Sequence, residues 1–247
     1  MKILANYNIK GGVGKTASAV NLAWCAAQQG YRTVIWDLDP QGAASYYFRI
    51  KPRVKGGSSA LISREKALDE VVKGTDFDNL DLIPADFSYR NLDLDLSDAK
   101  RPTRQLLKLL RPLADEYDLL FIDTAPSISL VSENIFQAAH GLLIPMIPTV
   151  LSVRTYSQLL KYFKQHPQPQ PALMPFFSMV DQRKRLHREL MVELLDKHPE
   201  MLKSAIPSAS AVELMGIKRA PVGCYAPESP SAQAFEALWD EVSQRIF

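Results

Sequence analysis

The segment KGGVGKT at residues 10–16 is a glycine-rich loop between two runs of different periodicity. Residues 2–8 form a strand-like run, residues 16–29 have the apolar spacing of a helix that stops at Gly30, and residues 32–36 read as a second strand. Two parallel strands need a crossover such as this helix between them. The loop therefore predicts a βαβ unit with a glycine-rich turn at the start of its helix.

The same alternation continues along the chain. Strand-like runs occur at residues 80–83, 119–122, 141–144 and 174–179, and helical patterns at residues 103–116, 151–163, 185–197 and 231–247. This order predicts an α/β fold with a doubly wound, mostly parallel sheet flanked by helices, whose ligands bind at the carboxyl ends of the strands. HPQPQP at residues 166–171 reads as an extended connector, and we expect a single domain over residues 1–247.

Composition agrees with a globular chain and excludes several classes. Of 247 residues, 47% are hydrophobic and 23% charged, and no apolar run approaches the roughly 20 residues that cross a bilayer. Without a signal peptide ahead of the first strand, we expect the cytoplasm. Cys25 and Cys224 lie outside any CxxC spacing and are expected to be small buried hydrophobes. A net charge of +2 does not by itself indicate a nucleic-acid partner.

The glycine-rich loop has the features of a phosphate site. Backbone N–H groups at the start of the helix converge on an anion, a lysine such as Lys15 binds the β- and γ-phosphates, and Thr16 is a ligand for Mg²⁺. The loop departs from the strict P-loop pattern because Ile9 stands where a glycine is expected. We predict ATP and Mg²⁺ as cofactors, with these nucleotide-binding residues: Gly11, Gly12, Val13, Gly14, Lys15, Thr16 and Ala17.

Two further segments place carboxylates where a phosphate site needs them. VIWDLDPQG puts Asp37 and Asp39 at the end of the second strand, and LLFIDTAPS puts Asp123 at the end of another, so both groups should face the loop across one sheet edge. We predict that Thr16, Asp39 and Asp123 serve the metal, Asp123 through water, and that Asp39 orients the attacking water. An isolated strand-end aspartate is more often a cap or turn residue.

The segments KGGVGKT, DLDPQG, DTAPS and LLIPMIPTVLSV together resemble the ParA-type partition ATPases, the deviant Walker A group that includes MinD-like proteins. The resemblance spans nearly the whole chain, with LDLIPAD in the middle and SMVDQRKRLHREL later. It implies that Lys10, which alone would read as a solvated loop lysine, reaches across an ATP-sandwiched dimer to the phosphates of the other subunit. Lys10, Lys15 and Asp39 are then the catalytic residues.

The sequence separates this chain from some branches of that family. The loop begins within the first dozen residues, so we expect no preceding helix-turn-helix domain. MinD-like members end in a basic amphipathic helix, whereas residues 232–247 carry three acids against one arginine. The apolar stripe of this segment is expected to be core: Phe235, Leu238, Trp239, Val242 and Ile246. Neither the cysteines nor the histidines have the spacing of a metal cluster.

The remaining branch coats DNA without reading its sequence. Two basic segments are candidates for phosphate contacts, and their residues are Arg183, Lys184, Arg185, Arg188, Lys218 and Arg219. Composition alone favours a solvated helix face, and the resemblance favours DNA. Many relatives have a cation in the turn before the last helix, but here the turn carries Glu228. The usual asparagine or threonine for the nucleobase is replaced by Ser178, so the sequence does not identify the residues that recognise the base.

The resemblance implies a cytoplasmic, nucleoid-associated ATPase. It would form a homodimer when ATP is bound, bind nonspecific double-stranded DNA, and position a plasmid, chromosome or protein compartment while a ParB-like or cargo-adaptor protein stimulates its slow hydrolysis. No membrane contact is expected. Two alternatives use the same fold: a metabolic phosphotransferase or ATP-dependent ligase, and a MinD-like membrane-positioning ATPase.

Overall fold

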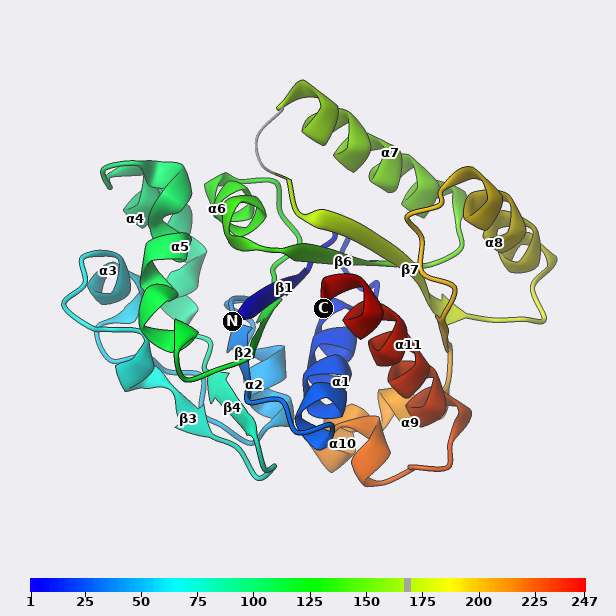
Figure 1. Ribbon diagram of the computed structural model, residues 1–247, viewed down its shortest axis with the longest axis horizontal. Coiled ribbons are helices and arrows are strands. Elements are labelled where there is room, and N and C mark those ends of the chain that lie inside the picture. Colours follow the sequence, from blue (N-terminus) through cyan, green and yellow to red (C-terminus); the bar gives the residue numbers. More distant parts are fainter. Residues whose placement is uncertain (167–169) are drawn as a thin grey trace.

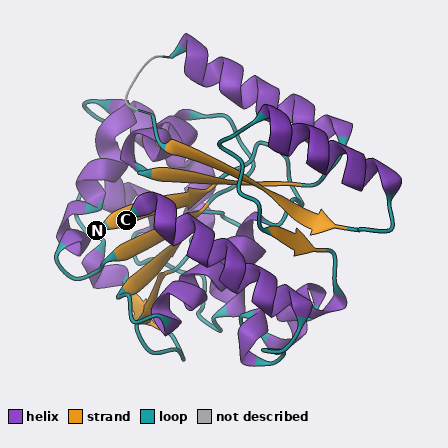
Figure 2. Ribbon diagram, turned by 45° about the vertical axis from the view of Figure 1, so that its right-hand side comes forward, coloured by secondary structure: helices purple, strands orange, loops and turns teal. Residues whose placement is uncertain are grey.

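The computed structural model describes residues 1–166 and 170–247 and shows one eight-stranded sheet between two layers of helices (Figures 1 and 2). Along the sheet the strands follow the order β3-β4-β2-β5-β1-β6-β7-β8, parallel throughout except for the β3–β4 pair. The strands are β1 (Lys2–Asn6), β2 (Thr33–Asp37), β3 (Lys73–Gly74), β4 (Leu80–Ile83), β5 (Leu119–Asp123), β6 (Gly141–Met146), β7 (Ala172–Val180) and β8 (Ala205–Pro207). The predicted α/β class is confirmed.

The α-helices are α1 (Lys15–Gln28), α2 (Ala43–Tyr47), α3 (Gly57–Ile62), α4 (Leu92–Ser97), α5 (Gln105–Leu109), α6 (Leu130–Ala138), α7 (Val150–Gln165), α8 (Arg185–Lys197), α9 (Ser210–Glu213), α10 (Met215–Lys218) and α11 (Pro230–Ile246). Short 3-10 turns are η1 (Asp69–Val71), η2 (Phe87–Asn91), η3 (Pro102–Arg104), η4 (Arg111–Ala114) and η5 (Val222–Cys224).

Alternation of side chains along the strands divides the core in two. Leu4, Ile35 and Phe121 point to the face covered by α1 and α11, whereas their neighbours in the strands point to the face covered by α4 to α7. Strand β1 lies between β5 and β6. After β1 the chain crosses through α1 on one face to β2, and after β5 it crosses through α6 on the other face to β6, so the direction of the strand order reverses near β1. The loop after β1 thus opens at a topological switch point, where ligands bind in such sheets.

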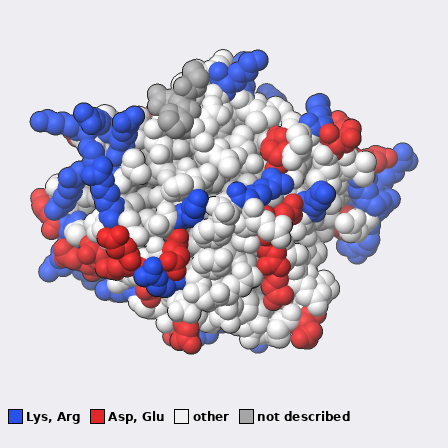
Figure 3. All heavy atoms as spheres, in the orientation of Figure 1, with Lys and Arg blue, Asp and Glu red and all other residues white. Residues whose placement is uncertain are grey.

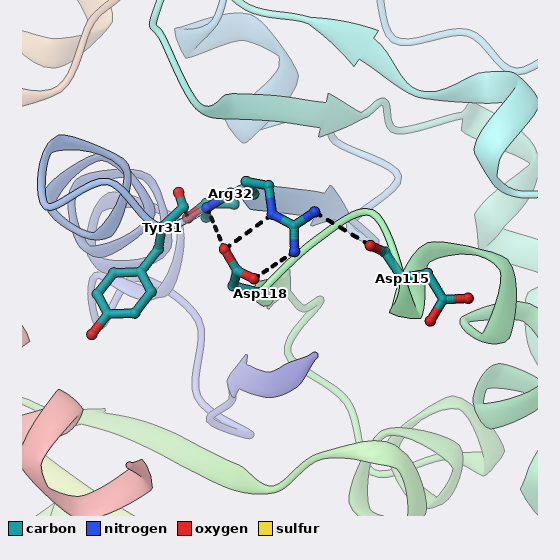
Figure 4. Close-up of polar contacts among 5 residues, drawn as sticks. Tyr31, Arg32, Asp115 and Asp118 are labelled. Atoms are coloured by element: carbon teal, nitrogen blue, oxygen red, sulfur yellow. Dashed lines mark hydrogen bonds and ion pairs between the residues drawn. The ribbon is translucent and has the colours of Figure 1, made fainter.

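At the amino ends of the strands, opposite the phosphate loop, a polar cluster joins the segments that precede β2 and β5 (Figure 4). The Arg32 guanidinium donates to both carboxylate oxygens of Asp118, at 3.2 and 2.7 Å, and to the carbonyl of Asp115. This pairing lowers the pKa of Asp118. Because Arg32 precedes β2 and Asp118 precedes β5, the contacts align the beginnings of two neighbouring strands and hence their ends at the loop side.

The predicted strands are confirmed with ends shifted by at most two residues, and α8 begins and ends as predicted. Strands β3 and β8 and helix α6 were not predicted. The single helix predicted over residues 103–116 is wrong: the structure has η3, α5 and η4 there. Pro112 cannot donate a helical hydrogen bond and its ring conflicts with a helical carbonyl one turn earlier, so the helix ends before it. Residues 167–169 of the predicted connector lie outside the described part.

Two expectations about burial have different outcomes. The stripe on α11 is core as predicted, with Leu238, Trp239 and Val242 fully buried. Cys25 is buried, but the expectation for Cys224 is wrong, because this residue, at the end of the turn η5, is exposed. Within the described residues, no helix combines the length and apolarity needed to cross a membrane.

Candidate nucleotide-binding site

The loop between β1 and α1 requires glycine at defined positions. Gly12 and Gly14 have φ angles of 69° and 91°, a region that side chains rarely adopt. A Cβ on Gly14 would also lie 2.7 Å from the Ser178 hydroxyl oxygen. Gly14 caps α1 without a side chain, and no acid lies in the first turn. The helix therefore presents its first N–H groups and its positive end to an anion.

Lys15 is the first residue of α1, and its side chain is folded back over the loop. Only 7% of the residue is exposed, and its Nζ donates to the Lys10 carbonyl oxygen at 3.2 Å. Burial lowers the pKa of Lys15, an effect that Asp123 and Asp39 oppose. A phosphate at the loop would supply the negative charge that this cation lacks.

An open cavity of about 590 Å³ lies over the loop, a size suited to a small-molecule ligand. The structure brings three of the predicted site residues, Lys15, Thr16 and Asp39, together in its lining. The other lining residues are Gly11, Gly12, Gly14, Ala17, Pro40, Gln41, Ala43, Tyr47, Ala125 and Pro126. Val13 belongs to the same loop but is buried beneath it.

Two buried carboxylates lie below the cavity. Asp37 ends β2 and Asp123 ends β5, and the two residues pair in the register of the sheet. Asp37 Oδ2 accepts from the Ser45 N–H and hydroxyl, each at 2.7 Å. Burial raises the pKa of Asp37 to about 6, although the Ser45 hydrogen bonds lower it.

Asp123 is more isolated. Among the described residues neither of its carboxylate oxygens has a hydrogen-bond partner of good geometry, and the side chain is fully buried. Burial, followed by the charge of Asp37, raises the pKa of Asp123 well above its usual value. The Thr16 hydroxyl and the Lys15 cation lie near enough to oppose this rise in its pKa. Buried carboxylates are costly unless they are paired with a cation. The carboxylate of Asp123 and the hydroxyl of Thr16 are oxygen ligands beside the phosphate loop. They fit Mg²⁺, because this ion binds proteins through only one or two carboxylates together with phosphate oxygens and water.

A second cavity of about 220 Å³ shares Gly12, Gly14 and Ala17 with the first. Its wall includes apolar side chains from several parts of the chain: Met179, Ile206, Pro207, Val212 and Phe235. An apolar cavity beside a phosphate loop suits a flat nucleobase. These residues were not predicted as part of a binding site, because they come from β7, β8, α9 and α11 and share no local pattern.

A third cavity, of about 160 Å³, lies on the other side of Pro40. Its polar lining includes Arg90, Thr124, Ser127 and Ser129. No sequence pattern predicted this cavity, because the lining hydroxyls lie on turns that carry ordinary capping residues. Ser129, for example, forms a capping box with Ser132 at the start of α6.

The basic residues around α8 are exposed but partly neutralised by acids of the same chain. Arg183 binds both carboxylate oxygens of Asp181, at 2.9 and 3.0 Å, and Arg185 binds Glu189 at 2.6 Å. Arg188 donates to the carbonyl of Gln182. The side chains of Arg183 and Arg185 remain 91% and 84% exposed. Figure 3 shows basic atoms gathered over α8 at the right of the molecule.

The structure does not bring Lys218 and Arg219 into this surface. They lie at the end of α10, which is at the bottom of Figure 1, whereas α8 lies at the right. Arg219 also has a role within the subunit: its Nε donates to the Tyr46 carbonyl at 2.9 Å and its guanidinium lies 4.5 Å from the centre of the Tyr46 ring. Lys218 is exposed.

Comparison with known proteins agrees with this geometry. A family model described as an AAA domain, AAA_31, matches residues 1–172. The chain belongs to this AAA-domain family. The sporulation initiation inhibitor protein Soj of Bacillus subtilis is 28% identical over 248 residues, covering 98% of each chain. The chromosome-partitioning ATPase Soj of Treponema pallidum is 27% identical, covering 99% of this chain and 98% of that one. The predicted resemblance to ParA-type ATPases is confirmed.

Solved structures show the same fold in proteins of different function. The cobyrinic acid a,c-diamide synthase of Mycobacterium smegmatis, with bound ATP analogue and magnesium, has a TM-score of 0.83 at 22% identity, covering 99% of this chain and 95% of that one. A plasmid partition protein from Borrelia burgdorferi has a TM-score of 0.79 at 21% identity, covering 99% of each chain. The shared fold does not decide between a partition ATPase and a synthase.

Proposed function

We propose that this AAA-domain protein is a Mg²⁺-dependent ATPase that forms an ATP-bound homodimer, binds DNA without sequence preference and positions a cargo. The observation that carries the proposal is the cavity in which Lys15, Thr16 and Asp39 meet above the buried Asp123. Membership in a family with Soj-type relatives supports it.

Each side of the cavity has a separate task in this proposal. The loop N–H groups and Lys15 hold the β- and γ-phosphates, while Thr16 and, through water, Asp123 hold Mg²⁺. Bound Mg²⁺ supplies positive charge that stabilises the phosphates. Asp39 Oδ1 accepts from the Gln41 N–H at 2.9 Å, which fixes the carboxylate at the cavity wall where it can orient water. The nucleobase occupies the apolar cavity beside Met179 and Phe235.

In this proposal Lys10 acts on another subunit. Its N–H donates to Asn8 Oδ1 at 2.9 Å and its carbonyl accepts from Lys15, so both backbone groups are held in the loop. Its side chain is absent from the lining of the cavity and, within residues 1–166 and 170–247, has no hydrogen bond or ion pair. In the proposed dimer this cation binds phosphates of the partner subunit and links nucleotide binding to dimerisation.

Dimerisation would also switch DNA binding. Counterion release gives a slope of about −0.9 in log K against log[salt] per phosphate contact, so joining two α8 surfaces doubles the slope and raises affinity strongly. We further propose a cytoplasmic, nucleoid-associated protein whose ParB-like or cargo-adaptor partner stimulates hydrolysis, so that the cargo follows the ATPase along DNA.

ATP hydrolysis and DNA binding measured together test this function. We expect slow hydrolysis that increases with duplex DNA and an adaptor, and binding of unrelated duplexes only with ATP and Mg²⁺. Size-exclusion chromatography should show a dimer under the same conditions. DNA affinity that is equal with and without ATP would contradict the proposed switch.

One observation favours a second candidate, an ATP-dependent ligase or phosphotransferase. The third cavity lies beside Pro40, is lined by Arg90, several hydroxyls and the acid Asp93, and could hold a small polar acceptor. A ligase would consume ATP only when a carboxylate acceptor is supplied, and its turnover would not respond to DNA. Screening turnover with small carboxylic acids, with and without DNA, separates the two functions.

A further inference from the structure

The buried polar atoms that lack a partner are concentrated in one place. Of eight such side-chain atoms among the described residues, five belong to Asn6, Asp37 and Asp123. Asn6 is the unexpected member, because it is not part of the loop and both its Oδ1 and its Nδ2 are buried and unpaired. A buried amide without a partner destabilises a protein, so its presence needs a reason.

The register of the sheet places Asn6 beside Asp123. Asn6 ends β1 and pairs with Asp123 at the end of β5, which in turn pairs with Asp37 at the end of β2. The residue two positions earlier in each of these strands packs in the core on the side of α1. Side chains two apart in a strand share a face, so the three polar side chains also point toward α1 and the phosphate loop.

Asn6, Asp123 and Asp37 form a row across the ends of three adjacent strands. Within this row, Asn6 has only one polar neighbour, Asp123. On its other side the paired residue is Leu143 of β6, which is apolar and buried. Adjacent strands lie about 4.8 Å apart, so the side chain of Asn6 can reach Asp123 but not Asp37, two strands away. The backbone between them is already held, since the Thr124 hydroxyl donates to the Asn6 carbonyl at 2.7 Å.

We propose that Asn6 is a positioning residue for the metal site. In the free protein its amide and the Asp123 carboxylate are unpaired among the described residues; with Mg²⁺ and nucleotide bound, the amide would donate to one Asp123 oxygen and leave the other for the metal side. An amide is suited to this task because it supplies N–H donors and no charge, whereas ionised aspartates only accept hydrogen bonds. The inference rests on the proposed nucleotide function. The unpaired amide destabilises the free protein, and metal binding is the reason that the chain retains it.

Two substitutions that are isosteric with each other, Asn6→Val and Asn6→Thr, separate this role from simple packing. Asn6→Val removes the amide and should raise the melting temperature of the nucleotide-free protein by about 2–4 °C, because a buried unpaired group disappears. It should also weaken the apparent Mg²⁺ affinity at saturating ADP about tenfold, as loss of residues that orient metal ligands does. Asn6→Thr keeps a hydroxyl donor and should retain most of the Mg²⁺ affinity.

Ser231 offers a matched control. Its hydroxyl is also buried and unpaired within the described residues, but it lies in α11, outside the row. Ser231→Ala should therefore stabilise the free protein without changing Mg²⁺ affinity. The measurement is a thermal-shift titration of Mg²⁺ with ADP present, which needs no turnover.

The outcomes are distinct. Equal Mg²⁺ affinity in wild type and Asn6→Val, or equal losses in Asn6→Val and Asn6→Thr, would overturn the positioning role. A lowered melting temperature for nucleotide-free Asn6→Val would overturn the claim that the amide is unsatisfied. Absence of any Mg²⁺-dependent shift in wild type would overturn the proposed nucleotide function itself.

Discussion

The phosphate site and the basic surface of α8 were both predicted from short runs of charged residues, but they differ in how the fold treats those charges. At the phosphate site, Lys15, Asp37 and Asp123 are buried and under-paired, so each still requires a partner. At α8, Arg183 and Arg185 are exposed and already bind Asp181 and Glu189 of their own chain. A buried charge interacts strongly with a ligand of opposite charge because little water screens it. An exposed arginine is screened by water and salt, so it binds anions weakly and with little specificity.

The largest effect is expected at the buried cation. Lys15→Ala should reduce ATP affinity at least about a hundredfold, because the loop loses the charge that binds two phosphates. Isothermal titration calorimetry measures this. Lys184→Ala, which removes an exposed lysine before α8, should leave ATP affinity unchanged. Equal losses of ATP affinity in the two variants would show that the buried lysine is no more specific for the nucleotide than the exposed one.

Asp39→Ala should separate binding from chemistry. The variant keeps the loop and Asp123, so we expect it to bind ATP and dimerise, while hydrolysis falls at least about a hundredfold for lack of an oriented water. Phosphate release and size-exclusion chromatography with ATP and Mg²⁺ report the two properties. A variant that hydrolyses ATP at the wild-type rate would show that Asp39 has another role.

Lys10→Ala tests whether the site is complete within one subunit. We expect nucleotide binding by a monomer, without ATP-dependent dimerisation and with hydrolysis reduced by an order of magnitude or more, about the effect of removing a charge-stabilising group. Analytical ultracentrifugation with ATP gives the oligomeric state. Full hydrolysis by a strictly monomeric variant would contradict the action of Lys10 on a partner subunit.

Arg185→Ala combined with Arg188→Ala should have a smaller and less specific effect. Nonspecific DNA affinity should fall, and the slope of log K against log[salt] should become shallower by about 2 per subunit, with ATP-dependent dimerisation unchanged. Fluorescence anisotropy with two unrelated duplexes at several salt concentrations tests this. An unchanged slope would move the DNA surface away from α8.

The smallest effect on DNA affinity should come from breaking the ion pair between Arg185 and Glu189. Glu189→Gln removes the carboxylate that binds Arg185 at 2.6 Å, so DNA affinity should rise about two- to threefold, the scale of an exposed ion pair. Glu193→Gln makes the same charge change on α8, on a residue without an ion pair in the described chain, and should raise affinity less. Equal increases would indicate that net charge matters and the Arg185–Glu189 pair does not.

Much of the phosphate site could be predicted because its residues are local. Gly12, Gly14 and Lys15 act through the backbone conformation and helix start that their own segment forms, and Asp123 ends a strand that its apolar run defines. Periodicity also predicted most strands and the four longest helices, α1, α7, α8 and α11. It failed over residues 103–116, where apolar spacing continues but Pro112 ends the helix.

Other features depended on which distant segments meet. The sequence alone determined the βαβ unit, the phosphate loop and the aspartates at the strand ends, because these follow from short-range sterics and the two-residue period of a strand. Tertiary structure decided that the wall of the apolar cavity joins β7, β8 and α11, that Arg219 stacks on Tyr46, and that Asn6 lies beside Asp123. Those neighbours are set by strand order and helix packing, which no local pattern encodes.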